Sequence, residues 1–430
     1  MGQLTPAAVD SPARRARALQ LVGILSGVAA GAWLGAAEVP AKLVSSGLSP
    51  FLISLMMVVG VFLGRWTLPT LIRGTTSIGA DLRQAPHLII WAVIAGALWA
   101  VANTLTVFAI RDLGLSIAFP LWNTNALIGI AWGVLLFHEL RSAGWVRWAC
   151  VGSGAVLMFI GGMILARVSG TQIPPAAAAK GIVAALGAGL LWGTMYVPYR
   201  KAYLSGMNPL SFISFFTVGE LGMMLALALH YLGGIASLSR QVQDSRRLLF
   251  WLLAAGFVWV IGDIFQQYAV KYVGISRGIP LSNSNQLWGL LWGALAFGEF
   301  RSWHHHATTA AILGSLLMAG GLVAISFSVA GESEQERWKQ AAHRERLRYG
   351  IDEQFVSSGL NGEPRQSEYT RRWFDWPILL AASAIFVWTA AIAGRPALSL
   401  NWNAVYVLLA LGFLLFLAAG AALWKITGFN

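Results

Sequence analysis

The sequence predicts an all-helical protein that crosses a membrane many times. Two observations predict this class, and a third gives its internal plan. Of the 430 residues, 57% are hydrophobic and 11% are charged, and the mean hydropathy is +0.64. This leaves too little polar surface to cover a soluble globule of this size. The apolar runs are near-continuous and about 20 residues long, which is the length of helix that crosses a bilayer, whereas a transmembrane barrel would need segments of about ten alternating residues.

The third observation is an internal duplication. Residues 114–142, GLSIAFPLWNTNALIGIAWGVLLFHELRS, return at 274–302 as GISRGIPLSNSNQLWGLLWGALAFGEFRS, with 15 of 29 positions identical at an offset of 160. The offset extends beyond this segment, because Trp99 is matched by Trp259 and Asn103 by Asp263. Near the start of each half, GAWLGAAEVPAK (31–42) is matched by GLLWGTMYVPYR (189–200). The chain therefore contains two copies of one unit.

Each copy accounts for five of twelve predicted helices. The twelve apolar stretches are 18–42, 51–72, 87–110, 114–137, 144–166, 181–203, 210–234, 248–270, 274–298, 307–330, 376–394 and 402–424. An odd number of helices makes the second copy start on the opposite side of the membrane, so the repeats are expected to have inverted topology around a site near the bilayer midplane. The predicted core is thus ten helices with two additional helices after it.

The connections complete the predicted organisation. TQIPPAAAAK (171–180) has the Pro pair and small residues of an exposed connection between the repeats. Residues 331–375 are charged and polar, and EQERWKQAAHRERLR (334–348) has the spacing of an amphipathic helix. The expected parts are an N-terminal segment 1–17, a first repeat 18–170, a linker 171–180, a second repeat 181–330, a charged segment 331–375 and two extra helices in 376–430.

Charge predicts orientation rather than nucleic-acid binding. The net charge of +12 comes from Lys and Arg that sit mostly in short connections and at the N-terminus, without a basic helical face. Three arginines precede the first span and eight basic residues lie in 331–375, so both segments are expected to be cytoplasmic. With twelve spans, both termini would be cytoplasmic, in the cell (inner) membrane. Residues 1–17 lack the apolar core of a signal peptide, and the single Cys150 is expected to be a packing residue.

The fourth helix of each repeat is the predicted substrate site. Each copy places polar residues just after a proline, which removes a helix donor and frees a carbonyl group. Neutral amides both donate and accept hydrogen bonds, and so match the hydroxyl groups of polyols; interhelical packing is the structural alternative. Because the copies are inverted, the amides of both should approach each other near mid-bilayer. The expected substrate-binding residues are Asn123, Asn125, Asn283, Asn285, Gln286, Asn103, Gln266, Trp99 and Trp259.

Helix breaks or hinges are expected at the four prolines that the repeats share. They are Pro40, Pro120, Pro198 and Pro280.

Ionisable residues inside the spans are candidates for proton coupling. A carboxylate at this depth is costly and usually faces a cavity or a partner. We expect Asp263, Glu38 or Glu220 to carry a coupling proton, with Asp263 the first candidate. The alternative is a structural ion pair with Arg65 or Arg277.

Other polar and aromatic positions allow weaker predictions. Glu139 with Arg141, and Glu299 with Arg301, end the fourth helices and predict an interfacial salt bridge or, alternatively, a pair of gates. Five tryptophans lie within spans, where they either pack or stack on sugar faces: Trp33, Trp99, Trp192, Trp259 and Trp292. The run His304–His306 lacks further ligands at suitable spacing, and no nucleotide or hydrolase motif occurs. We expect no metal, no cofactor and no enzyme activity.

The repeated helices resemble those of the glucose/ribose porter family in the drug/metabolite transporter superfamily, which is related to rhamnose–proton symporters. The resemblance covers about 18–330 and rests on four segments: PLWNTNALIGIAWGVLLFHEL (120–140), PLSNSNQLWGLLWGALAFGEF (280–300), GALWAVAN (96–103) and GLLWG (189–193). It implies ten helices in two inverted repeats and small sugars as substrates, taken up with protons. The paired Asn-x-Asn and the module 331–430 depart from the family pattern.

The expected function is therefore secondary active transport of a monosaccharide or similar polyhydroxylated metabolite by proton-coupled alternating access. The expected partners are the sugar, protons and the lipid bilayer, and the small-residue stripes at Gly154–Gly161 and Gly314–Gly321 would also allow a homodimer. Two alternatives remain: a drug or metabolite exporter of the same superfamily, and a non-transporting membrane scaffold or receptor that uses 334–348 to bind a partner.

Overall fold

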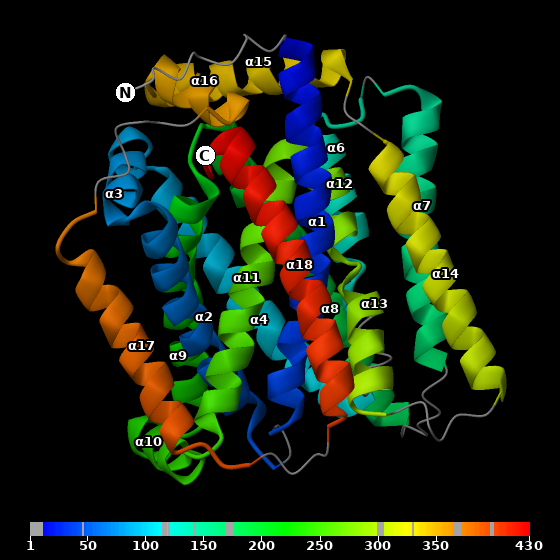
Figure 1. Cartoon of the computed structure of the whole chain (residues 1–430), viewed down its shortest axis with the longest axis vertical. Coiled ribbons are helices and arrows are strands. Elements are labelled where there is room, and N and C mark those ends of the chain that lie inside the picture. Colours follow the sequence, from blue (N-terminus) through cyan, green and yellow to red (C-terminus); the bar gives the residue numbers. More distant parts are fainter. Residues whose placement is uncertain are drawn as a thin grey trace.

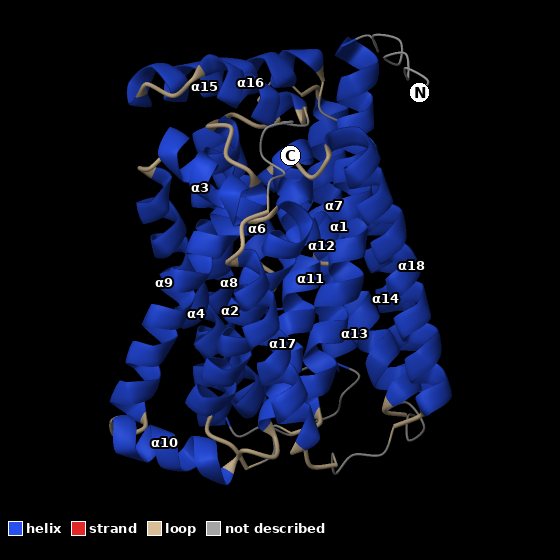
Figure 2. Ribbon diagram, turned by 60° about the vertical axis from the view of Figure 1, so that its left-hand side comes forward, coloured by secondary structure: helices blue, strands red, loops and turns tan. Residues whose placement is uncertain are grey.

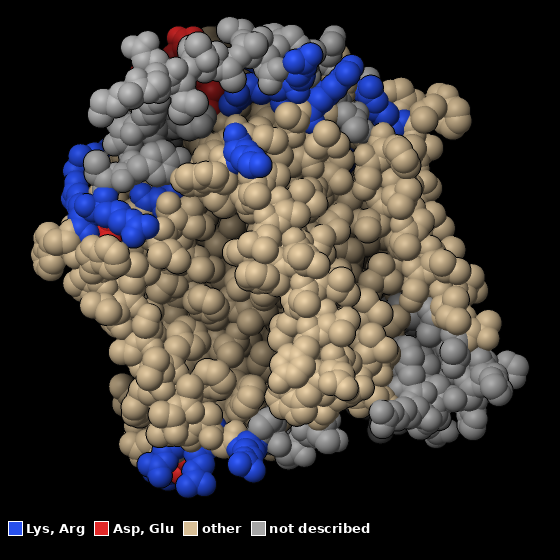
Figure 3. Space-filling model, in the orientation of Figure 1, with Lys and Arg blue, Asp and Glu red and all other residues tan. Residues whose placement is uncertain are grey.

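The computed structural model confirms the all-helical class. It describes residues 12–44, 47–113, 118, 121–141, 143–167, 175–298, 305–328, 331–363, 371–395 and 400–430, and these residues contain helices and loops without a strand (Figure 2). By length and composition, eight described helices could cross a membrane, and three more are apolar but shorter. On the face of the molecule shown in Figure 3, Lys and Arg lie toward the two ends of the bundle, with a broad band of uncharged residues between them.

The helices of the first repeat are α1 (Pro12–Lys42), α2 (Pro50–Arg73), α3 (Thr75–Gln84), α4 (Leu88–Leu113), α6 (Asn125–Phe137) and α7 (Trp145–Arg167). Those of the second are α8 (Pro175–Leu204), α9 (Pro209–Tyr231), α10 (Ile235–Asp244), α11 (Leu249–Val273), α12 (Ile275–Ser282), α13 (Asn285–Leu291), the π-helix η1 (Trp292–Ala296) and α14 (His305–Phe327). The C-terminal helices are α15 (Glu332–Tyr349), α16 (Glu353–Asn361), α17 (Asp375–Ala391) and α18 (Trp402–Thr427).

Local sequence explains where these helices begin. α2 and α9 begin with proline, whose fixed φ suits the first helical position and whose missing N–H group leaves no donor unsatisfied there. The side chain of Asn208 caps α9 by accepting a hydrogen bond from Leu210 N at 2.8 Å.

Two helices begin before the predicted boundaries of the segments that precede them. The N-terminal segment was expected to reach residue 17, but α1 already begins at Pro12. The connection 171–180 was expected to be non-helical, but α8 begins at Pro175 and includes the alanines that follow. Proline at the first position and a run of alanines both favour a helix, which outweighs the turn signal of the Pro pair.

Glycines hold the two repeats together at equivalent places. A Cβ added to Gly60 on α2 would lie 2.2 Å from the carbonyl oxygen of Leu253 on α11, and one added to Gly219 on α9 would lie 2.1 Å from that of Val93 on α4. Each contact joins one helix of the first repeat to one helix of the second. In one contact the glycine belongs to the first repeat and the carbonyl group to the second, and in the other contact the roles are reversed. This is the pattern expected for units related by a twofold axis, while the inverted topology itself stays a prediction.

The core formed by the two repeats is covered by further elements at both ends and on one side. Helices α15 and α16 lie across one end of the bundle and α10 lies at the other (Figures 1 and 2). Helix α18 packs along α1, where Trp33 Nε1 donates to the carbonyl oxygen of Gly412 at 3.1 Å. The amphipathic helix expected at 334–348 is confirmed as α15.

Candidate functional site

The site is built where the fourth helix of each repeat is interrupted. In the second repeat α12 ends at Ser282 and α13 begins at Asn285, with a turn between them. In the first repeat a turn at Asn123 and Thr124 precedes α6. Pro280 lies inside α12, two residues before its end, and removes one backbone donor there. Pro120 lies outside the described residues.

The amides of the two repeats meet at these breaks. Asn283 Nδ2 donates to Asn125 Oδ1 at 2.9 Å and lies 3.3 Å from the carbonyl oxygen of Asn123, which it also approaches as a donor. All three residues are buried. The expectation that the two Asn-x-Asn motifs approach each other is therefore confirmed for Asn283 with Asn123 and Asn125.

A cavity of about 50 Å³ lies beside this contact. Its walls are formed by Leu34, Trp99, Trp122, Asn123, Asn125, Trp192, Met195, Tyr196, Trp259, Gln266, Asn283 and Asn285. Seven of the nine predicted substrate-binding residues are among them. Ligand pockets are typically about 300–1,000 Å³, so the helices around this cavity must separate before it holds a molecule larger than a few waters.

Tryptophans form the apolar part of the wall. The rings of Trp99 and Trp259, which are equivalent in the two repeats, lie edge to face with centroids 5.0 Å apart. Trp122 and Trp192 form a second edge-to-face pair at 6.0 Å. The indole Nε1 atoms of Trp99 and Trp192 are buried without a hydrogen-bond partner among the described residues, so both remain available as donors to a ligand.

A short chain of hydrogen bonds holds the polar part of the wall in place. Tyr196 Oη donates to Gln266 Oε1 at 3.0 Å, and Gln266 Nε2 donates to Ser282 Oγ at 2.6 Å. These two hydrogen bonds distinguish the oxygen of the Gln266 amide from its nitrogen, and they fix the orientation of the side chain. Ser282 occupies the position of Trp122 in the other repeat, so the two halves of the cavity wall differ in polarity.

The structure does not bring Asn103 and Gln286 to the cavity. Both are buried, but neither is among the residues that line it. Asn103 lies on α4 one turn beyond Trp99, as Asp263 lies on α11 one turn beyond Trp259. In both helices the tryptophan lines the cavity, and the polar residue four positions later lies beyond it.

A buried charge cluster lies next to the cavity. Arg65 on α2 donates from Nη1 to Glu220 Oε2 on α9 at 2.6 Å and from Nη2 to Asp263 Oδ2 on α11 at 2.7 Å. All three side chains have no exposed area, and Gln267 Nε2 donates to the other oxygen of Asp263. Asp263 and Glu220 therefore form the ion pair with Arg65 that the sequence left as the alternative to free coupling carboxylates.

The cluster touches the cavity wall through an aromatic ring. The guanidinium carbon of Arg65 lies 4.3 Å from the ring centroid of Phe216 and 5.2 Å from that of Trp259, which also lines the cavity. This is the geometry of a cation–π contact. The third coupling candidate, Glu38, lies on α1, and its side chain is outside the described residues.

Two of the four prolines do not break their helices, while a hinge at either one stays a prediction. α1 and α8 run through Pro40 and Pro198 without interruption. Pro40 is two residues from the end of α1 and Pro198 six from the end of α8, so the lost hydrogen bond falls in the last turns, where a helix tolerates it more easily.

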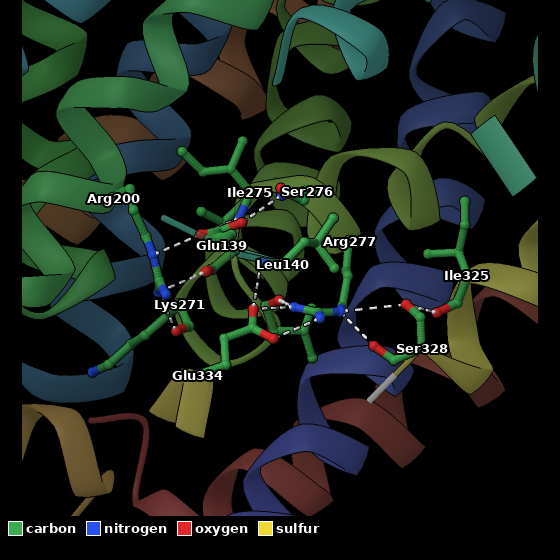
Figure 4. A network of polar contacts seen from close by, with 12 residues as sticks. Glu139, Leu140, Arg200, Lys271, Ile275, Ser276, Arg277, Ile325, Ser328 and Glu334 are labelled. Atoms are coloured by element: carbon green, nitrogen blue, oxygen red, sulfur yellow. Dashed lines mark hydrogen bonds and ion pairs between the residues drawn. The ribbon is translucent and has the colours of Figure 1, made fainter. Parts of the chain in front are cut away.

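The predicted salt bridge between Glu139 and Arg141 is also wrong. Glu139 is fully buried and pairs with Arg200 on α8 at 3.1 Å. It also accepts hydrogen bonds from Ile275 N and Ser276 N at the start of α12 (Figure 4). A carboxylate gains more from a helix N-terminus and a buried guanidinium than from an exposed neighbour. Glu299 and Arg301 lie outside the described residues.

The sequence analysis missed several lining residues, namely Leu34, Trp122, Met195 and Tyr196. Trp122 could have been found, because it lies within the repeated motif beside Asn123. Met195 and Tyr196 have no such signal, because their role depends on which face of α8 turns inward. His305 and His306 belong to α14, but their side chains and His304 lie outside the described residues, and the described part contains no group of three metal-ligating side chains.

This fold and this site define a polytopic helical membrane protein with a polar, aromatic cavity at the meeting point of two repeats. A family model described as "Sugar transport protein" matches residues 183–358. The matched stretch is less than half of the chain, so over these residues the chain is similar to sugar transport proteins. This agrees with the resemblance seen in its repeated helices.

Individual relatives agree with this family. A "Putative sugar uptake protein" of Lactobacillus johnsonii is 38% identical over 22% of this chain and 33% of its own length. A second protein of that name, from Listeria innocua, is 26% identical over 44% of this chain and 62% of its own. The "Glucose uptake protein GlcU" of Staphylococcus xylosus is 26% identical over 49% of this chain and 69% of its own. The chain therefore spans less than two thirds of the first two relatives, and all three names are those of uptake proteins rather than enzymes.

Proposed function

We propose that the chain is a secondary active transporter of a monosaccharide or a similar polyhydroxylated metabolite. The observation that carries this proposal is the cavity in which amides from both repeats and four tryptophans converge. The amides supply donors and acceptors for hydroxyl groups, and the indole faces suit the C–H surface of a sugar ring. The printed names of the relatives, which are sugar and glucose uptake proteins, support the same substrate class.

The arrangement of the repeats supports alternating access as the proposed mechanism of transport. The wall of the cavity comes from both repeats, so a rocking movement of one against the other would expose it to each side of the membrane in turn. The glycine contacts between α2 and α11 and between α4 and α9 support an inverted-repeat core, because each repeat supplies the glycine in one contact and the carbonyl group in the other. The cavity would enlarge during this movement, since about 50 Å³ does not hold a monosaccharide.

Coupling to protons is proposed at the charge cluster, with Glu220 rather than Asp263 as the proton carrier. One guanidinium group serves two carboxylates, so the ionised cluster has a net charge of −1. Both oxygens of Asp263 accept hydrogen bonds from charged or amide groups, whereas Glu220 Oε1 has only the neighbouring Thr217 hydroxyl as a donor among the described residues. A proton on that oxygen would neutralise the cluster while the bond from Arg65 to Oε2 remains.

The second candidate function is export of an aromatic metabolite or drug. The tryptophan pairs favour it, because a flat aromatic ligand would stack on Trp99 or Trp192 without using the amides. Binding separates the two candidates: the sugar transporter binds monosaccharides through Asn283 and Gln266, whereas the exporter binds aromatic compounds and tolerates alanine at both positions. The scaffold alternative has less support, since the inner face of α15 is used by the core.

Reconstituted vesicles test the proposed function. Uptake of labelled monosaccharides is measured with and without an inward proton gradient, in vesicles that contain folded protein and in empty vesicles. We expect protein-dependent uptake that increases with the gradient. A folded, reconstituted protein that moved no sugar under either condition would overturn the substrate class, and uptake that ignored the gradient would overturn the coupling.

A further inference from the structure

Helices α15 and α16 lie over part of one end of the core. We call residues 332–361 the cap. Both helices lie across the bundle rather than along it (Figures 1 and 2). An amphipathic helix on a membrane surface would turn its apolar face toward lipid, whereas α15 directs charged and aromatic side chains into the end of the core. The contacts of this inner face indicate what the cap does.

Glu334 is the most deeply inserted residue of the cap. It forms a bidentate ion pair with Arg277 on α12, at 2.8 and 2.9 Å, and both side chains are almost completely buried (Figure 4). Glu334 Oε1 also accepts a hydrogen bond from Leu140 N at 3.3 Å, next to Glu139. One side chain of the cap thus joins the start of α12 in the second repeat to the end of the fourth helix in the first.

Three further contacts attach α15 to the core. The ring of Trp338 lies 4.2 Å from the guanidinium carbon of Arg200, which itself pairs with Glu139. Glu345 pairs with Lys201 at 3.0 Å. At the far end of α15, Tyr349 stacks on His87, just before α4, with ring centroids 3.7 Å apart. The helix therefore spans both repeats along its whole length.

Helix α16 and the residues after it are attached to the core by further contacts. A Cβ added to Gly359 would lie 2.5 Å from the carbonyl oxygen of Gly206, which follows α8, so the two backbones are in direct contact. The side chain of Arg15 on α1 donates to the carbonyl oxygens of Asn361 and Gly362 at 2.9 and 3.0 Å. The C-terminal Asn430 donates to Ser358 O at 3.2 Å.

The cap lies above the cavity along α8. Tyr196 lines the cavity, and Tyr199 and Tyr203, both fully buried, follow on the next turns and pack with Phe212 of α9. Arg200 lies at the same level as these tyrosines and is the first residue of α8 to touch the cap. At 1.5 Å per residue, about 6 Å of helix separates Tyr196 from Arg200. The buried tyrosines and Arg200, at one level, therefore lie between the cavity and the cap.

We propose that the cap is a latch, by which we mean that it holds this end of the transport path closed. We call the contacts of Glu334 with Arg277 and Leu140 the catch, because they must break before this end opens. The latch rests on the proposed transport cycle, because its purpose is to bias which end opens. If the two repeats move apart at this end, the bonds of Glu334 to Arg277 and Leu140 cannot all persist, since they join elements of different repeats. Release of the cap is then a required step of opening, and any treatment that weakens the catch favours the open end.

Cysteine labelling tests whether the catch holds the cap. Ser205 is fully buried and precedes Gly206, whose backbone lies against Phe355 and Val356 of α16. We therefore expect a Ser205→Cys reporter in a Cys150→Ser chain to react faster with a maleimide when the cap lifts. We expect Glu334→Gln to increase the labelling rate at least tenfold. The matched control is Glu336→Gln, which removes the same charge from the same helix but from an exposed pair with Lys339. Equal rates in the two variants would overturn the proposal.

A milder variant covers the case in which Glu334→Gln does not fold because it leaves Arg277 buried without its carboxylate. Glu345→Gln removes a partly exposed contact of the same helix, and we expect a two- to threefold faster labelling of the reporter. Labelling that stayed at the rate of Glu336→Gln would contradict a latch that spans α15.

Cross-linking tests whether the latch gates transport. Lys201→Cys with Glu345→Cys, in the Cys150→Ser chain, is joined by a cleavable bis-maleimide. We expect sugar exchange in vesicles to fall more than tenfold when the link is present and to return after cleavage; exchange that continues at the unlinked rate would overturn the gating role. The proposed function fails if no variant moves sugar. If Glu334→Gln still exposes the reporter in that case, Glu334 nevertheless holds the cap on the core.

Discussion

Asn283 is the residue through which the second repeat contacts the first at the site. Its side-chain nitrogen bonds Asn125 Oδ1 and approaches Asn123 O. A buried amide that loses its partner costs about 1–3 kcal/mol, and the same group is available to a ligand hydroxyl. Asn283 is therefore expected to affect both packing and binding.

The first prediction concerns this residue. Asn283→Ala should weaken sugar binding about 5- to 150-fold, which corresponds to the loss of about 1–3 kcal/mol. Titration of purified protein with monosaccharides, followed by thermal shift, measures the change. The control is Asn361→Ala, because Asn361 is exposed on α16 and bonds only to Glu363 by its side chain among the described residues. Equal affinity in the two variants would remove Asn283 from the site.

The second prediction separates binding from coupling. Glu220→Gln keeps an oxygen for the bond from Arg65 but cannot exchange a proton, so equilibrium exchange of sugar should persist while gradient-driven accumulation is lost. Both are measured in the same vesicles, with Glu336→Gln as an exposed control. Accumulation at the control level would show that the proton is carried elsewhere.

At the scale of the elements, close helix crossings define the core. The sequence predicted the helices well, since each of the twelve predicted stretches overlaps a helix and α15 falls at the predicted place. It did not predict the cap. A helical pattern of charges in 334–348 shows that a helix forms, but the partners of Glu334 and Trp338 come from α12 and α8, far away in the chain, and only the tertiary structure brings them together.

The third prediction tests the crossings between the repeats. Gly219→Ala places a methyl group 2.1 Å from the carbonyl oxygen of Val93, and overpacking of this kind costs about 1–3 kcal/mol. Gly222→Ala on the same helix meets no atom within 4 Å and should stabilise by about 0.5–1 kcal/mol. Thermal unfolding in detergent micelles measures both. A Gly219→Ala protein as stable as Gly222→Ala would contradict the packing described for α4 and α9.

The fourth prediction concerns the effect of pH on the cap. Partial burial and the neighbouring Lys201 lower the pKa of His87, which Glu345 opposes. A His with a lowered pKa is held in the neutral form in the docked state, so docking is complete above its ordinary pKa of about 6.5 and weakens as the pH falls below that value. Labelling of the Ser205→Cys reporter should therefore accelerate below about pH 6.5. The comparison is made at each pH with a His87→Gln chain, and parallel profiles would contradict a role for His87.

At the scale of the whole molecule, the two repeats are similar in plan but unequal in polarity. This inequality is visible in the sequence, in pairs such as Trp122 with Ser282 and Asn103 with Asp263. The site confirms part of it, because Ser282 holds Gln266 while Trp122 contributes an indole wall. The sequence alone does not show whether Asp263 is free or paired, because its partner Arg65 lies on α2 and reaches Asp263 only through the packing of α2 against α9 and α11.

The C-terminal helices extend this plan. α18 packs along α1, α17 lies against α2 and α11, and the cap between α14 and α17 ties both repeats together at one end. The departure from the family pattern at 331–430 is thus a part of the core assembly rather than a separate unit. Its position makes it the natural place to control which end of the path opens.

The central claim is that the cavity at the meeting point of the repeats binds a sugar for transport. Uptake of labelled monosaccharides into vesicles containing either the unaltered chain or Asn283→Ala tests it most directly. We expect saturable uptake by the unaltered chain and a concentration for half-maximal uptake about 5- to 150-fold higher in the variant. Uptake that is equal in both, or absent from folded and reconstituted unaltered protein, would contradict the claim.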